Sequence, residues 1–126
     1  MASFKVTCDV DTGLVNCKFS GFVSDADAEE LVEELTRAIH AARRRYGPLR
    51  MLIDNRDGTV FSTSVTASVA VLKSVYDQKD RIAVIVPTGL RKLQAQRNVS
   101  DQTCIFLTED EAMNWLRSAR DEVQIG

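Results

Sequence analysis

Apolar and polar residues alternate in two short stretches near the start of the chain. Every second residue is apolar over 4–10 and again over 15–19, and the turn-forming segment 11–13 lies between them. A period of two is typical of a strand buried on one face, so the pattern predicts a β-hairpin. Because both apolar faces must point to one core, paired residues have numbers of opposite parity and the loop has two or four residues.

A four-residue loop would place Cys8 directly opposite Cys17. That arrangement would permit a disulfide under oxidation, whereas in a reducing cytoplasm we expect two buried thiols.

The next stretch has a helical spacing of apolar residues that ends at about Tyr46. Ser24 is followed three residues later by Asp27, which is the pattern of a capping box at a helix start. Acids in the first turn and Arg43–Arg45 in the last complement the helix macrodipole. The three arginines could bind a phosphate, but the dipole explains them without a ligand. The predicted apolar stripe consists of Leu31, Leu35, Ile39, Ala42 and Tyr46.

Three further apolar runs predict strands over 49–54, 82–86 and 102–107, the first two apolar on both faces, as in parallel sheets covered by helices. Helices are predicted over about 62–76, over about 90–97, and after a second capping box at Thr108–Glu111. The last helix would bury one face, formed by Ala112, Trp115, Leu116 and Ala119. The order β-β-α-β-α-β-α-β-α predicts one α/β domain over 1–126. It would be a single open mixed sheet of about five strands, an N-terminal antiparallel hairpin then parallel β-α units, with four helices.

Composition narrows the class of protein. The 126 residues are 44% hydrophobic and 27% charged, as in a soluble globular domain. The longest apolar run, 82–86, is far shorter than the roughly 20 residues of a membrane span. With no signal peptide either, we expect a cytoplasmic protein. A net charge of -2 argues against nucleic-acid binding. Three cysteines without a C-x-x-C spacing give no zinc site, so we expect no metal and no cofactor.

Catalytic patterns are scarce. His40 is the single histidine of the chain and falls in the middle of a helix, where no Ser–His–Asp or Cys–His arrangement is expected. Gly58 and Gly89 stand alone, so no glycine-rich phosphate loop is predicted. Asp54 and Asp57 remain as a pair that could act in acid–base chemistry or bind Mg²⁺. That role would require both carboxylates to converge on one pocket instead of capping backbone amides.

The candidate site lies beyond the carboxyl ends of the strands, where open α/β sheets bind ligands. Segments 54–58, 62–64 and 87–89 all fall there. Hydroxyls at a helix start favour an anion, although Ser and Thr also cap helices without any ligand. The predicted ligand- or partner-binding residues are Asp54, Asn55, Arg56, Phe61, Ser62, Ser64 and Thr88.

The helix predicted over 62–76 carries little charge before Lys73. Such a helix either packs between two layers or presents a patch to a partner. Val60 and Phe61 precede it, and they would either staple the helix start or extend a contact surface.

Several short segments of the chain, taken in order, resemble the STAS domain, which is the anti-sigma-factor-antagonist fold. They resemble more closely a STAS-like branch whose members are also named SEC14-like. They are Phe19-Ser20-Gly21, Leu52-Ile53-Asp54, Arg81-Ile82-Ala83-Val84 and Thr108-Glu109-Asp110-Glu111-Ala112-Met113-Asn114-Trp115-Leu116. The resemblance implies a small cytoplasmic regulatory module without catalysis. In the anti-sigma antagonists a phosphorylatable Ser follows the strand-end Asp in a D-S-S-G-type loop. Here Asp54 matches, and Arg56 stands at the position of that serine.

We therefore expect a non-enzymatic STAS-like regulatory or protein-interaction module. Its contact surface would be the 54–64 loop with the exposed side of the central helix, used for a protein partner or for self-association. The alternative is a carrier or sensor of a small lipid-like or anionic ligand, with a cavity near Phe61. A small hydrolase or transferase using Asp54 and Asp57 is the least favoured hypothesis.

Overall fold

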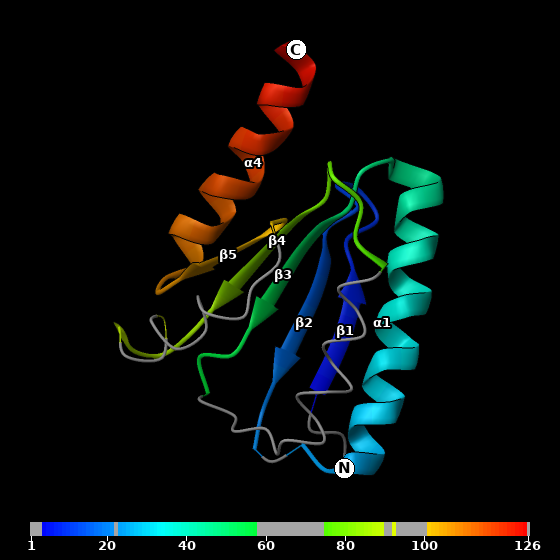
Figure 1. Ribbon diagram of the computed structural model, residues 1–126, viewed down its shortest axis with the longest axis vertical. Helices are drawn as coiled ribbons and strands as arrows, with labels where there is room; N and C mark the ends of the chain where they lie inside the picture. Colours follow the sequence, from blue (N-terminus) through cyan, green and yellow to red (C-terminus); the bar gives the residue numbers. More distant parts are fainter. Residues whose placement is uncertain (1–3, 22, 58–74, 90–91, 93–100, 126) are drawn as a thin grey trace.

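The computed structural model describes residues 4–21, 23–57, 75–89, 92 and 101–125. Five strands form one sheet in which the order in space equals the order in the chain (Figure 1). The first two strands are antiparallel and all later neighbours are parallel, which confirms the predicted mixed sheet with an opening hairpin. The strands are β1 (Phe4–Cys8), β2 (Val15–Phe19), β3 (Arg50–Asp54), β4 (Arg81–Ile85) and β5 (Thr103–Phe106).

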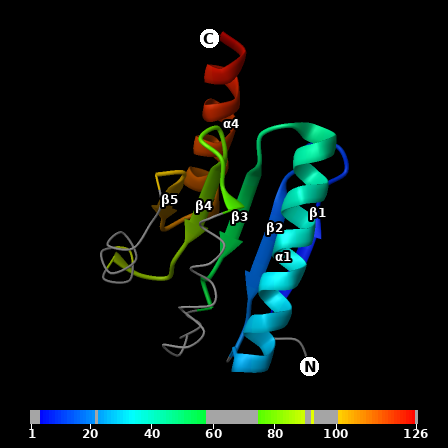
Figure 2. The same cartoon turned by 45° about the vertical axis from the view of Figure 1, so that its right-hand side comes forward.

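Two helices, α1 (Asp25–Tyr46) and α4 (Glu109–Ile125), cover opposite faces of the sheet (Figures 1 and 2). Neighbouring residues of β3 show the division, because Met51 packs in the core under α1 and Leu52 in the core under α4. Four helices were expected, and the described residues contain these two. The helices predicted over 62–76 and 90–97 lie, apart from 75–76 and 92, outside the described residues.

The start of α1 is the capping box that the sequence predicts. Oγ of Ser24 accepts a hydrogen bond from the amide of Asp27 at 3.1 Å, and the Asp27 carboxylate accepts one from the Ser24 amide at 3.2 Å. The predicted apolar stripe is confirmed, because Leu31, Leu35, Ile39 and Ala42 are buried against the sheet and Tyr46 is partly buried.

The start of α4 is capped differently. Oγ1 of Thr108 accepts from the amide of Glu111 at 3.3 Å, and the same hydroxyl donates to the Glu111 carboxylate at 3.0 Å. Ala112 and Leu116 are buried on the sheet, and the Trp115 ring lies 5.6 Å from the Phe106 ring. Three of the four predicted face residues therefore pack as expected, while the side chain of Ala119 lies outside the described part.

The predicted register of the hairpin is wrong, although the predicted parity is right. Cys8 lies opposite Val15, and Cys17 lies opposite Val6. The loop spans residues 9–14 because Asp9 organises it: its amide donates to Leu14 O, and its carboxylate accepts from the Asp11 amide. Cys8 is exposed, Cys17 is buried and Cys104 is half-buried, so the expectation of a buried thiol pair holds for Cys17 alone. Burial, with the negative charge of Glu34, raises the pKa of Cys17 to about 12.

The hairpin loop touches the end of α1 at Gly13. Its φ of +78° lies in the left-handed region, and an added Cβ would lie only 2.7 Å from Cδ2 of Tyr46. The hydroxyl of Tyr46 in turn donates to the carbonyl of Val10. Glycine is therefore required at this position both for the backbone turn and for the close approach of the ring.

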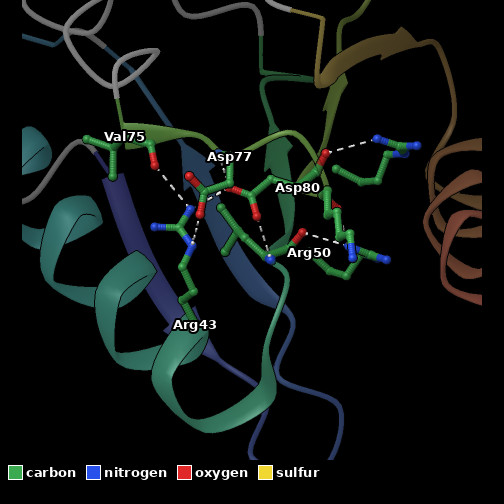
Figure 3. Close-up of polar contacts among 8 residues, drawn as sticks. Arg43, Arg50, Val75, Asp77 and Asp80 are labelled. Carbon is green, nitrogen blue, oxygen red and sulfur yellow. Dashed lines mark hydrogen bonds and ion pairs between the residues drawn. The ribbon is translucent and has the colours of Figure 1, made fainter. Parts of the chain in front are cut away.

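A fully buried carboxylate, that of Asp80, joins three elements at the amino ends of the central strands (Figure 3). Its Oδ1 accepts from the amide of Leu49 at 2.8 Å, and its Oδ2 accepts from the amide of Asp77 at 2.8 Å. Oδ2 also forms an ion pair with Arg43 in the last turn of α1. The same guanidinium donates to the carbonyl of Val75 at 3.1 Å.

This cluster changes the interpretation of the three arginines at the end of α1. Arg44 and Arg45 are exposed, as the dipole interpretation allows, but Arg43 is three-quarters buried and has specific partners. Asp77, an exposed residue, adds a carboxylate 3.3 Å from Nε of Arg43. The last turn of α1 is therefore bound, through Asp80, to the residues that precede β3 and β4.

Replacing Asp80 tests this cluster. Asp80→Ala removes the partner of a largely buried guanidinium, and we expect the free energy of unfolding to fall by about 3 kcal/mol. Asp77→Ala is the matched control, because its exposed carboxylate is worth less than about 1 kcal/mol. Urea unfolding of both variants measures the difference, and equal losses would contradict the assignment.

A pair of glycine variants tests the contact between the hairpin loop and α1. Gly21 also has a positive φ, of +70°, but an added Cβ there would have no neighbour within 4 Å. Gly21→Ala should therefore cost only the backbone strain, about 1 kcal/mol. Gly13→Ala should cost about 2 kcal/mol more, because the new methyl overlaps the Tyr46 ring. Thermal unfolding compares the two, and an equal loss would mean that the ring moves aside freely.

Candidate functional site

The site begins with Asp54, the last residue of β3. In the sheet register it lies between Lys18 of β2 and Ile85 of β4, and only 5% of its surface is exposed. Arg56 folds back onto it: Nε donates to Oδ1 at 2.9 Å and Nη2 to Oδ2 at 2.7 Å. The backbone amide of Arg56 also donates to Oδ1, at 3.1 Å. Both oxygens of the buried carboxylate are thus bound by a residue two positions further along the chain.

These contacts set the charge of the pair. The hydrogen bond from the Arg56 side chain is the main reason that the pKa of Asp54 lies below its ordinary value of 3.8. The amide and the charge of Arg56, with the charge of Lys18, add to the effect and outweigh the opposing effect of burial. Asp54 raises the pKa of Arg56 in return. Asp54 is therefore ionised at neutral pH, where a general acid would have to be protonated.

The residues around Arg56 tie the strand-end loop to three other elements. The amide of Asn55 donates to the carbonyl of Ile85 at 2.9 Å, which extends the pairing with β4 by one residue. A carboxylate oxygen of Asp57 accepts from the amide of Gly21, after β2, at 3.1 Å. Nη2 of Arg56 lies 3.5 Å from the carboxylate of Glu109, the first residue of α4. The loop therefore leaves β3 in a fixed conformation.

The predicted site residues are thus only partly tested by the structure. Asp54, Asn55 and Arg56 follow one another at the end of β3, and Thr88 is exposed in the segment that follows β4; their role in binding stays a prediction. Phe61, Ser62 and Ser64 lie outside the described residues, as does the cavity expected near Phe61. The predicted acid–base pair meets an obstacle, because Asp54 and Asp57 each accept a hydrogen bond from a backbone amide.

Two residues of the site were not singled out from the sequence. Glu109 falls at the predicted start of the last helix. It lies close to Arg56 although 53 positions separate the two residues in the chain. Lys18 falls on the polar side of the second predicted strand. Only the register of two parallel strands shows that Lys18 and Asp54 are neighbours.

A groove of about 440 Å³ lies beside the site, between β2, β3 and the start of α4. Within the described residues, no cluster of three or more His, Cys, Asp or Glu side chains could hold a metal ion. Among the same residues, no helix combines the length and the apolar character that crossing a membrane requires. The groove is lined by Leu14, Asn16, Leu52, Glu109, Asp110, Met113, Asn114 and Arg117.

An open mixed sheet in this strand order, with helices on both faces, is the architecture of a STAS-like domain. The model of the SpoIIAA-like family matches residues 14–117, so the chain belongs to the SpoIIAA-like family. The predicted family resemblance is thereby confirmed, while its SEC14-like part stays a prediction.

The comparison with solved structures agrees on the fold. One similar structure is that of the anti-sigma factor antagonist SpoIIAA in its unphosphorylated form, with a TM-score of 0.61 and 16% sequence identity. The similarity covers 90% of this chain and 97% of that chain. At this identity the likeness shows the fold alone. The comparison with curated proteins gives no significant match.

Removing the Arg56 side chain tests the electrostatics of the site. In Arg56→Ala the carboxylate loses its main partner while its burial remains, so we expect the pKa of Asp54 to rise, as followed by NMR titration of the carboxyl carbon. Because the pKa in the folded wild type lies below 3.8, the pair stabilises the fold above that pH, and this contribution is lost as the pH falls through the lowered pKa.

The difference in unfolding free energy between wild type and Arg56→Ala should therefore be largest near neutral pH and shrink below about pH 4. Arg37→Ala on the exposed side of α1 is the control, since its side chain is 72% exposed and lies 3.5 Å from the Glu33 carboxylate. A difference that stays constant with pH would show that the pair of Asp54 and Arg56 does not act through charge.

Proposed function

We propose that this chain is a non-enzymatic regulatory module that binds a protein partner through the carboxyl edge of its sheet, centred on Arg56. The observation that carries the proposal is the state of this side chain. Its guanidinium is held by a buried carboxylate, yet 47% of the side chain is exposed. An arginine that is already ordered loses little conformational entropy when a partner binds, and arginine is enriched among residues that dominate interfaces.

The contacts of segment 54–57 support the same proposal. Segment 54–57 is fastened to β4, to the residue after β2 and to α4, so a partner would meet a preformed surface. Association with such a surface needs no ordering of a loop, and small backbone changes are the norm for preorganised complexes. The contact surface would continue into Phe61, Ser62, Ser64 and the central helix predicted over 62–76. Self-association through that helix is the second form that the contact could take.

The position of Arg56 also bears on regulation. In the anti-sigma antagonists that this chain resembles, the phosphorylated serine stands at the position of Arg56. An arginine has a permanent positive charge and no hydroxyl to modify. Binding through this edge would therefore not be switched by phosphorylation at residue 56, and control would act on the partner or elsewhere in the chain.

Affinity capture with a matched pair of variants tests the proposed function. Arg56→Ala and Arg37→Ala remove the same charge, but only the first lies on the proposed surface. We expect proteins captured from an extract of the source cells by wild type and Arg37→Ala to fall at least about tenfold with Arg56→Ala, a loss of about 1.4 kcal/mol.

Urea unfolding must first show that both variants are folded, and sedimentation velocity of each reports self-association. Capture or self-association that is equal in both variants would contradict the role of Arg56. A wild-type chain that captures no protein and stays a monomer would contradict the proposed function itself.

A further inference from the structure

The half of the sheet that α4 leaves open carries a row of positive charge. Lys5 and Lys18 alternate along their strands with residues that pack under α1, so both point to the opposite face, the face of α4. The register places Lys5 directly opposite Lys18, and Lys18 beside Asp54. Arg56 lies over Asp54 and continues the row at the strand end. We call Lys5, Lys18 and Arg56 the basic row.

Nothing in the described fold neutralises the two lysines fully. Both are exposed, and within the described part of the chain neither makes a hydrogen bond or an ion pair. The acid next to them in the register, Asp54, is buried and already bound by Arg56. Like charges directly opposite each other in an antiparallel pair are destabilising. The pairing of Lys5 with Lys18 is therefore unfavourable in the free protein, although Lys18 also lies beside the Asp54 charge, and an anionic group over the row would offset this repulsion.

The overall charge makes this row distinctive. Acids outnumber bases in the chain, which has a net charge of -2, so the row does not follow from a generally basic composition. Two acids border it: Glu109 lies near Arg56, and Asp57 is bound at Gly21 after β2. A long polyanion such as a nucleic acid would meet these carboxylates, whereas a short acidic segment would not.

The size of the row fits such a segment. Neighbouring strands lie about 4.8 Å apart, so the three strands β1, β2 and β3 span about 10 Å. Carboxylates on alternate residues of an extended chain are about 6.6 Å apart. Two or three carboxylates from a stretch of three to five residues would therefore cover the row.

We propose that the basic row binds a short acidic segment of the partner protein, with two or three Asp or Glu carboxylates placed over Lys5, Lys18 and Arg56. This inference rests on the proposed function and names the chemistry of its partner. The lysines supply attraction and orientation, because exposed charges act mainly on the rate of association and on specificity. The ordered guanidinium of Arg56 supplies the fixed contact at the end of the row.

Binding of a fluorescent peptide of eight glutamates, followed by anisotropy at low salt, tests the proposal. The double variant Lys5→Gln and Lys18→Gln removes the row, and Arg44→Gln with Arg45→Gln is the matched control. Each double variant removes two positive charges from exposed positions. Arg44 and Arg45 lie in the last turn of α1. We expect the affinity to fall at least about tenfold in the first variant and less than about twofold in the second.

The melting temperature separates a binding role from a structural one. Removing two opposed like charges should leave the melting temperature of the lysine variant unchanged or higher. An equal loss of affinity in both double variants, or no binding by the wild type, would overturn the proposal. So would displacement of the peptide by inorganic phosphate, or tighter binding of a single-stranded DNA oligonucleotide to the same row.

Capture experiments keep this inference distinct from the proposed function. If the lysine variant still captures the proteins that Arg56→Ala loses, the function through Arg56 stands and the acidic partner segment is wrong.

Discussion

The buried carboxylate of Asp80 is the contact on which the rest of the structure depends. Three parts of the chain meet on it: the last turn of α1, the residue that leads into β3, and the turn that leads into β4. Removing a carboxylate from water is costly, and the cost is offset because Oδ1 is bound by one amide and Oδ2 by an amide and a guanidinium. This contact fixes where the two central parallel strands start, and thereby where their carboxyl ends lie.

An ion pair between an aspartate and an arginine lies at each end of the central strands, and the two pairs differ in the exposure of the arginine. Asp80 is fully buried and Arg43 is three-quarters buried, so their pair acts mainly to hold the fold together. At the other end, Asp54 is buried but its partner Arg56 is half exposed. One pair is thus structural, while the other presents an ordered cation at the carboxyl edge of the sheet. The exposure of the arginine, more than the presence of an ion pair, marks the site.

Local patterns predicted the local structure well, and distant contacts explain what they missed. The period of two placed the first two strands, apolar runs placed the other three, and the capping patterns at Ser24 and Thr108 placed the starts of α1 and α4, because these signals depend on neighbouring residues. The hairpin register failed because Asp9 builds a longer loop than turn chemistry alone implies. Asp80 gave no signal, since its partner Arg43 lies 37 residues away. Likewise, the strand-end rule located Asp54, but the pattern of residues does not show that Arg56 binds it or that Glu109 lies beside Arg56.

The strand order has a consequence for the order in which the carboxyl edge of the sheet forms during folding. Each strand adds to the edge formed by the strand before it, so the sheet can grow in the direction of synthesis, as domains commonly do on the ribosome. Loop closure between distant segments is slower than local pairing. The contact of Arg56 with Glu109 needs the last helix in place, whereas the hairpin needs only its own residues. The link between Arg56 and α4 is therefore among the last contacts to form, whereas the contact of Arg56 with Asp54 needs only two neighbouring residues of the chain.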